Sequence, residues 1–241
     1  MLRLDMAVDS SRLWYIRNVD LFKNLPESDL DELAKVAQLV EFGRGEEICA
    51  SGTGNPYAYV IKEGNVRLIM HSPSGKQLTV AILKPGDVIG GADLFGTETG
   101  GESAEALSPC TLYRVPVDVL HRFAQGRPEF SLRINKEVNR SRMLVMNRMQ
   151  DVLFLTVQER LSRLILRLAD EFPGVTTSGK RFVNIRLTHQ ELADLIGANR
   201  EAVSATLIKL RRSKCVNSVH GFLVLASEEL LRTNVAKDAA A

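Results

Sequence analysis

The stretch that most constrains the fold of this 241-residue chain is LTHQELADLIGANREAVSATLIKL, from Leu187 to Leu210. Its first half has apolar residues at the i, i+3, i+4 spacing of a helix with one buried side: Leu192, Leu195 and Ile196. Gly197 follows where this helix should stop, because glycine enters the left-handed conformation without a side-chain penalty. Asn199 can cap a second helix, whose apolar side would consist of Val203, Leu207 and Leu210. The stretch predicts two short helices joined by a tight turn.

Polar side chains occupy the other side of the second helix, near its N-terminus. They are Arg200, Glu201 and Ser204. A helix-turn-helix directs base-reading side chains into the major groove of DNA from these positions. Many helix pairs joined by a glycine turn are only packing units, so this pattern alone leaves both interpretations open.

Two neighbouring features favour DNA binding. Residues 179–220 hold eight basic and three acidic side chains, a net charge of +5, which is typical of a phosphate-binding surface and also of a solvated basic face. Residues 215–225 have the pattern of two short strands around His220 and Gly221, which predicts a wing. The basic side chains that we expect to contact phosphates are Lys209, Arg211, Arg212 and Lys214.

The charge is distributed unevenly along the chain. Residues 1–127 carry a net charge of −4, whereas residues 179–241 carry +4. An acidic front and a basic end suit a sensing module joined to a nucleic-acid-binding module.

The segment from Val40 to Pro116 has the pattern of a β domain. Short apolar runs at residues 57–61, 65–70 and 78–83 have the length of strands, and glycine-containing turns separate them. Many short strands in succession predict a sandwich, barrel or roll. We expect Trp14 and Ile16, in the lead before this segment, to pack onto it.

Residues 128–154 favour one long helix. Five of them follow a heptad-like spacing and form a candidate dimer seam: Ile134, Val138, Ser141, Val145 and Val152. Such a seam would suit a second copy of the same helix and hence a homodimer. A long core helix within one chain explains the periodicity equally well.

No cofactor and no metal site are expected. Cys49, Cys110 and Cys215 lie far apart, which argues against a zinc finger and against a four-cysteine cluster within one chain. His71 and His121 are isolated, and a lone histidine is more often a surface or packing residue than a ligand.

The chain also lacks an apolar run long enough to span a membrane. Asp5 and Asp9 stand where a signal peptide would be apolar. We therefore expect a cytoplasmic protein with no membrane partner.

The order of these parts resembles the CRP/FNR (catabolite activator and fumarate–nitrate regulator) family of bacterial transcription factors, over roughly residues 20–227. The most specific marks are Gly64, the Pro85–Asp87 turn with Ile89 and Gly90, and the 187–204 stretch. The resemblance implies an α+β fold with a cyclic-nucleotide-binding-type β-roll, a dimerisation helix and a winged helix-turn-helix. The implied domains are an N-terminal lead at 1–20, the β-roll at 21–127, the dimerisation helix at 128–154, the DNA-binding domain at 155–230 and a tail at 231–241.

The resemblance also assigns roles at the DNA. Three residues at the start of the first helix would lie near the phosphates: Thr188, His189 and Gln190. Arg200 and Glu201 occupy base-reading positions, where arginine pairs with guanine and glutamate accepts from cytosine. Ser204 matches a reading position of the fumarate–nitrate branch, whereas Ala205 replaces a third reading arginine. The implied partner is palindromic double-stranded DNA, with an altered preference at an inner base pair.

The effector pocket departs from the family pattern. The family's cyclic-AMP cassette pairs Gly-Glu-Leu with Arg-Ser-Ala, whereas this chain has Gly90, Gly91 and Ala92, and then Glu102, Ser103 and Ala104. A carboxylate repels the phosphate that an arginine would bind. Val145 and Met146 replace the Thr-Ser pair that contacts adenine. We expect no cyclic-AMP binding of the family's kind, and both another ligand and effector-free DNA binding stay open.

Two other functions compete with a homodimeric transcription regulator. One is a ligand-binding regulatory subunit whose helix-turn-helix docks a protein, which the Arg200–Glu201 pair and the local positive charge disfavour. The other is an enzyme, for which the sequence offers no nucleophile–base pair, metal-ligand spacing or phosphate loop. By analogy with the family, RNA polymerase would be a further partner, with residues 173–180 as the candidate contact.

Overall fold

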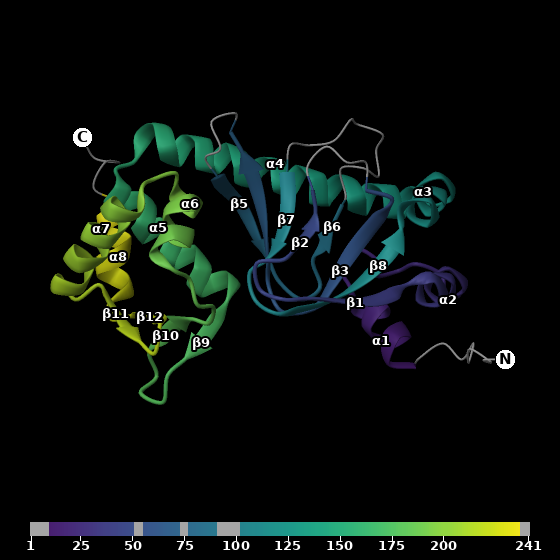
Figure 1. Cartoon of the computed structure of the whole chain (residues 1–241), viewed down its shortest axis with the longest axis horizontal. Coiled ribbons are helices and arrows are strands. Elements are labelled where there is room, and N and C mark those ends of the chain that lie inside the picture. The colour runs from purple at the N-terminus through teal and green to yellow at the C-terminus, as the bar shows by residue number, and fades with distance from the viewer. Residues whose placement is uncertain (1–9, 51–54, 73–76, 91–101, 237–241) are drawn as a thin grey trace. The chain divides into compact units, whose positions relative to one another are not determined.

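The computed structural model describes residues 10–50, 55–72, 77–90 and 102–236, and the chain divides into two compact units between Met143 and Leu144 (Figure 1). The division falls inside helix α4 (Pro128–Phe154), so this one helix contributes residues to both units. Each unit has its own core, as expected for a two-module chain.

The N-terminal unit contains two four-stranded antiparallel sheets that form a β-roll. Their strand orders are β1-β8-β3-β6 and β2-β7-β4-β5. Apolar side chains from both sheets share one core, in which Ile61, Val66 and Leu112 are completely buried. The roll predicted for this region is confirmed. The strands are β1 (Gln38–Phe42), β2 (Glu47–Cys49), β3 (Tyr57–Glu63), β4 (Val66–His71), β5 (Gln77–Leu83), β6 (Val88–Ile89), β7 (Glu102–Ala106) and β8 (Cys110–Pro116).

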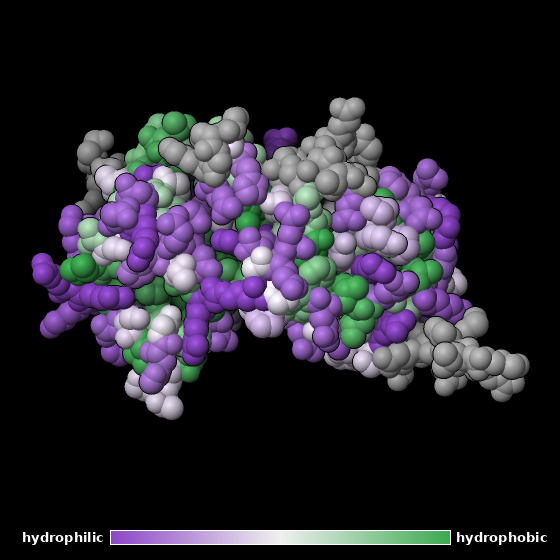
Figure 2. All heavy atoms as spheres, in the orientation of Figure 1, coloured by the Kyte–Doolittle hydropathy of each residue, from purple (hydrophilic) through white to green (hydrophobic). Residues whose placement is uncertain are grey.

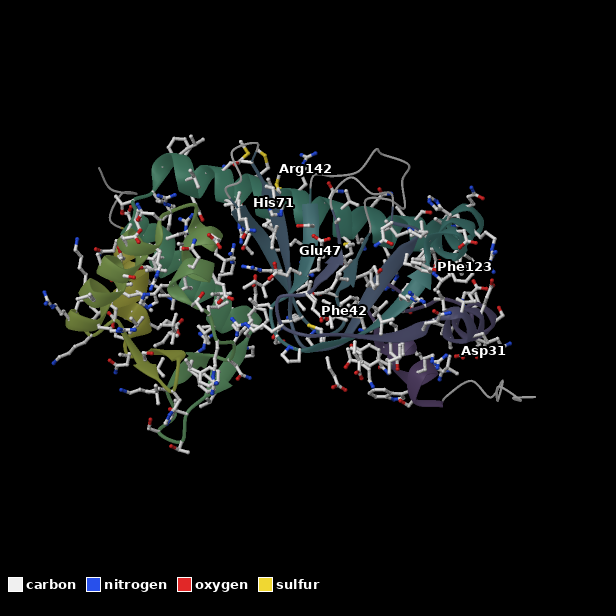
Figure 3. The ribbon with its side chains drawn as sticks, viewed as in Figure 1. Asp31, Phe42, Glu47, His71, Phe123 and Arg142 are labelled. Carbon is white, nitrogen blue, oxygen red and sulfur yellow. The ribbon has the colours of Figure 1, made fainter. Side chains whose placement is uncertain are left out.

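Helices cover the β1-β8-β3-β6 sheet and form a second core with it. Helices α2 (Glu27–Val36) and α3 (Val117–Gly126) lie at the same end of the strands (Figure 1). Three rings join this layer: Phe130 of α4 stacks on Phe22 at 6.3 Å and meets Phe123 of α3 edge-on at 6.3 Å. Phe123 lies at the end of the roll opposite to His71 of β4 (Figure 3).

Helix α1 (Ser10–Asn18) is anchored to this second core. Ile16 is completely buried, but Trp14 is 65% exposed, so the expected packing is confirmed for the first residue and wrong for the second. Arg12 donates from Nη1 to the carbonyl oxygen of Ala37 at 3.0 Å, where the end of α2 leaves such acceptors without helical partners. The hydroxyl of Tyr15 donates to a carbonyl oxygen of β3.

The first turns of α4 belong to the N-terminal core. Ile134 is 2% exposed and packs in the same cluster as Phe22 and Phe130. Ile134 was expected in the dimer seam, and this expectation is wrong, because a side chain buried in its own unit cannot contact a second chain. Helical periodicity identifies a buried side but does not tell which partner buries it.

The C-terminal unit packs three helices around one core. Helix α5 (Val157–Glu171) begins at a capping box formed by Thr156 and Glu159. It packs on α6 (His189–Ile196) and α7 (Arg200–Arg212). The apolar residues predicted for α6 and α7 are buried together with apolar residues of α5. The buried set is Leu161, Leu164, Ile165, Leu168, Leu192, Leu195, Ile196, Val203, Leu207 and Leu210.

A four-stranded antiparallel sheet completes the unit, in the order β11-β12-β10-β9. Strands β11 (Val216–Val219) and β12 (Phe222–Leu225) form the predicted wing. His220 and Gly221 at its tip have φ values of 49° and 83°, the left-handed region that a tight hairpin turn requires. Strands β9 (Pro173–Val175) and β10 (Arg181–Val183) form a second hairpin.

Helix α8 (Glu228–Ala236) extends the unit beyond the domain boundary expected at residue 230. Leu231 is completely buried, and α8 packs on α5. Arg232 and Glu228 form an i,i+4 ion pair at 2.6 Å along the helix. The expectation of a tail is therefore wrong for residues 231–236, because Leu231 completes the core.

Gly64 provides a test of the roll. Its φ is +85°, and a Cβ at this position would lie 2.3 Å from the carbonyl oxygen of Pro109. Gly45 is the matched control: its φ is +84°, but a Cβ added there would have no neighbour within 4 Å. Gly45→Ala should therefore lower the free energy of unfolding only by the cost of backbone strain, about 1–2 kcal/mol. Gly64→Ala should lower the free energy of unfolding by about 3 kcal/mol or more. Denaturant unfolding, followed by circular dichroism and Trp14 fluorescence, measures both, and equal losses would contradict the steric argument.

Candidate nucleic-acid interface

Hydrogen bonds between neighbouring residues fix both helices of the α6–α7 pair. Thr188 and Glu191 form a capping box at the start of α6, in which the Thr188 hydroxyl accepts from the Glu191 amide at 3.1 Å. Gly197 ends α6 in the left-handed conformation, with φ 63° and ψ 45°. The Oδ1 atom of Asn199 then accepts from the amide of Ala202 at 2.8 Å and starts α7. The predicted helix stop at Gly197 and the predicted cap at Asn199 are confirmed.

The start of α7 presents its polar residues to solvent. Arg200 and Glu201 are both exposed in the first turn, opposite the buried Val203 and Leu207. The exposed side continues along α7 with Ala205, Ile208, Lys209, Arg211 and Arg212. Hydrophilic side chains project from the side of this unit where α7 lies (Figures 1 and 2). This surface has the residues to contact both base edges and phosphates.

Ser204 is half-buried and contacts His189 of α6. The Nδ1 atom of His189 lies 2.7 Å from the Ser204 hydroxyl oxygen. Burial and the nearby guanidinium groups of Arg211 and Arg200 hold the pKa of His189 below its usual value. Sequence analysis gave these two residues separate roles, because their separation of 15 positions carries no periodic signal.

Two of the residues expected near phosphates have partners within α6. The Thr188 hydroxyl serves as the helix cap, and Gln190 donates from Nε2 to Oδ1 of Asp194 at 2.7 Å. Lys214 follows α7 in a left-handed conformation, with φ 58°.

The local charge of this segment is smaller than its sequence indicates. Arg181 donates to Asp170 at 2.6 Å and to Glu228 at 2.9 Å. These two carboxylates raise the pKa of Arg181, and they neutralise one of the eight basic groups. Residues far apart in the chain make this contact, so counting charges in a window could not reveal it.

Arg186 is a basic residue that sequence analysis did not assign to a site. Its guanidinium carbon lies 4.8 Å from the ring centre of Phe222 in the wing. Phe222 in turn packs edge-on against Phe182 at 5.4 Å. The exposed Arg186 is therefore held near the tip of the wing, beside Gly221.

The effector-type pocket is described only in part. Gly90 has a φ of +95°, and a Cβ there would lie 3.2 Å from backbone atoms of Tyr57 and Ala58, so the site favours glycine. Ser103 is 5% exposed, and its hydroxyl lies 3.2 Å from Nε2 of His71. Gly91 and the side chain of Glu102 lie outside the described residues. Val145 and Met146 lie on α4 with exposed side chains.

The described residues contain no group of three histidine, cysteine or acidic side chains that could hold a metal ion. In the same part of the chain, no helix is both long and apolar enough to cross a membrane. Cys49, Cys110 and Cys215 are free thiols.

Comparison with known proteins matches both units. Residues 39–127 match the cyclic nucleotide-binding domain, and residues 159–233 match the Crp-like helix-turn-helix domain. The global nitrogen regulator of Synechococcus elongatus is 30% identical over 185 residues, which cover 74% of this chain and 81% of that protein. The CRP-like cAMP-activated global transcriptional regulator of Mycobacterium tuberculosis is 29% identical over 187 residues, covering 78% and 83%.

A solved structure gives the same result. A transcriptional regulator of the CRP/FNR family from Thermus thermophilus matches with a TM-score of 0.68 and 25% identity, covering 83% of this chain and 99% of that chain. The relatives are regulators of transcription and not enzymes. This chain therefore belongs to the CRP/FNR family of DNA-binding transcription regulators.

Proposed function

We propose that the chain is a homodimeric regulator that reads palindromic DNA through Arg200, Glu201 and Ser204, without cyclic-AMP binding of the family's kind. The observation that carries this proposal is the first turn of α7. Its caps fix the helix, and its arginine and glutamate side chains are exposed on a basic surface.

Base reading and affinity come from different residues in this proposal. Arg200 can donate two hydrogen bonds to O6 and N7 of guanine, and Glu201 can accept from N4 of cytosine. The exposed basic residues of α7 and its C-terminus bind phosphates and position the helix without selecting a sequence. They are Lys209, Arg211, Arg212 and Lys214.

The proposed dimer forms through the C-terminal part of α4. Apolar residues there are between 36% and 70% exposed: Val138, Val145, Met146, Met149, Val152 and Leu153. Hydrophobic surface covers this end of α4 (Figure 2). Apolar residues exposed to water at heptad-like spacing favour association with a second copy of the helix, because the second copy buries them. The proposed seam runs from Val138 to Val152, with Ser141 included and Ile134 excluded.

The residues that replace the cyclic-AMP cassette support the effector part of the proposal. Glu102 stands where the family's arginine neutralises the phosphate, and Gly91 stands where its glutamate holds the ribose. The Mycobacterium tuberculosis relative is cAMP-activated by name. In this proposal the chain differs from that relative because cyclic AMP does not control its DNA binding. The proposal allows a different ligand or none.

RNA polymerase is a further proposed partner, through the β9–β10 hairpin. Val175 at this hairpin is 68% exposed.

Selection from a random DNA pool tests the effector part directly. The purified protein without nucleotide should select a palindrome, and adding cyclic AMP should leave its affinity unchanged, because a carboxylate at position 102 repels the phosphate. If the protein selected a palindrome only in the presence of cyclic AMP, the proposal that it responds to another ligand or to none would be wrong. Absence of selection without nucleotide, followed by selection in a metabolite screen, would favour another ligand.

Arg200→Ala and Lys209→Ala separate base reading from phosphate binding. Arg200→Ala should cost about 1–3 kcal/mol on the selected palindrome and relax the preference at one base pair. Lys209→Ala should weaken binding to selected and random DNA alike. It should also reduce the slope of log affinity against log salt concentration by about one. Fluorescence anisotropy across a salt series measures both effects. Parallel losses on both DNAs for both variants would refute the assignment.

Met149→Glu tests the seam, and Met143→Glu is its matched control. Both methionines are 54% exposed, so both variants place a charge at equally accessible sites. Met149 lies four residues after Val145 on the seam side, whereas Met143 lies two residues before Val145 on the other side of the helix. Met149→Glu should weaken the dimer about 100-fold or more, because it buries an unpaired charge. Sedimentation equilibrium measures the dimer, and dissociation by Met143→Glu alone would place the interface elsewhere.

A further inference from the structure

The contact between His189 and Ser204 joins the two helices of the DNA-reading unit. His189 is the first residue of α6, and its Nδ1 atom lies 2.7 Å from the hydroxyl oxygen of Ser204 on α7. Both side chains are half-buried, so solvent reaches them only in part. Ser204 lies four positions after Arg200, which places both on one side of α7.

We propose that His189 is a positioning residue whose protonation state sets whether the Ser204 hydroxyl donates or accepts a hydrogen bond at a base edge. The preference at one base pair would then depend on pH. This inference rests on the proposed function, because it requires Ser204 to face a base.

The chemistry follows from the single proton of a hydroxyl group. When the imidazole is neutral with its proton on Nε2, Nδ1 accepts the hydroxyl proton of Ser204. The serine oxygen can then only accept at the DNA, from an amino group such as N4 of cytosine or N6 of adenine. When the imidazole takes up a proton from solvent, Nδ1 becomes a donor to the serine oxygen. The hydroxyl proton is thereby released to an acceptor, such as O6 or N7 of guanine or O4 of thymine.

The charges around the imidazole make its protonation respond to DNA. Arg211 and Arg200 of α7 are the charged groups that act on it, and together with burial they hold the pKa of His189 below its usual value in the free protein. On α6 itself, Glu191 is engaged in the capping box and Asp194 accepts from Gln190. On α5, the other helix that packs against α6, Arg160 donates to the carbonyl oxygen of Ile196 at the far end of α6.

A phosphate bound by Arg211 would offset the field of that arginine and raise the pKa of His189 in the complex. A group whose pKa rises on binding strengthens binding below its pKa in the free protein. That contribution is lost as the pH rises through the pKa in the complex. DNA affinity should therefore increase as the pH falls through the pKa of His189 in the complex.

The test measures the preference at one base pair as a function of pH. The full-length protein is titrated with the palindrome selected from the random pool and with duplexes that carry each base pair at the position that Ser204→Ala relaxes. Anisotropy at constant ionic strength is recorded from about pH 5.5 to about 8.5, which brackets histidine titration. Toward low pH, the wild-type preference should shift about tenfold toward the base that offers an acceptor, and the other positions should not shift.

Four variants identify the source of the shift. His189→Asn keeps an amide near the position of Nδ1 that does not titrate, so its preference should not change with pH. His220→Asn is the matched control: it removes the wing histidine, at a left-handed position that asparagine tolerates, and should keep the shift. Ser204→Ala should lose the preference at every pH. Ser204→Thr keeps a hydroxyl and should keep the pH-dependent shift, which tests the inference even if His189→Asn binds DNA poorly.

The outcomes distinguish this inference from the function on which it rests. A pH-dependent shift that persists in His189→Asn, or that appears equally at all base pairs, would overturn the role of His189 and leave sequence-specific DNA binding intact. Absence of sequence selection at any pH would overturn the proposed reading of DNA and the inference together.

Discussion

The DNA-reading surface depends on the left-handed turn at Gly197. With φ at 63°, this residue lets the chain leave α6 and reach Asn199, which caps α7, within two residues. Arg160 of α5 donates to the carbonyl oxygen of Ile196 just before the turn, so the helix end is also held from the core. A side chain at position 197 would meet the strain of a positive φ. The exposure of Arg200 and Glu201 follows from this one backbone conformation.

Helix α4 shows how one helix can serve two environments. At its start, Phe130 and Ile134 fill the core of the N-terminal unit. Near its end, Met149 and Val152 remain in water. The burial of the first residues anchors the helix, and the exposed residues form the surface that the proposed dimer would remove from water. The proposed dimer and the β-roll therefore use different stretches of the same helix.

Local signals predicted much of this structure from the sequence. The cap at Asn199 and the turn at Gly197 involve residues within a few positions of each other, so their spacing carries the information. The wing around His220 was predictable for the same reason. Local patterns in residues 40–116 indicated short strands, and the resemblance to the family supplied the roll. Contacts between distant residues were not, because no periodicity links their positions. Arg181 is neutralised by Asp170 and Glu228, and Leu231 of α8 completes a core whose other members lie elsewhere in the chain.

The sequence by itself determined the order of the modules, the helix-turn-helix and the residue types on its exposed side, because short-range propensity and hydrogen bonding set these features. The tertiary structure alone decided which exposed groups remain available. It removed Ile134 from the candidate seam by burying it, and it joined His189 to Ser204 across two helices. Helix packing sets such contacts, since a neighbouring element, and not the local pattern, supplies the partner atoms.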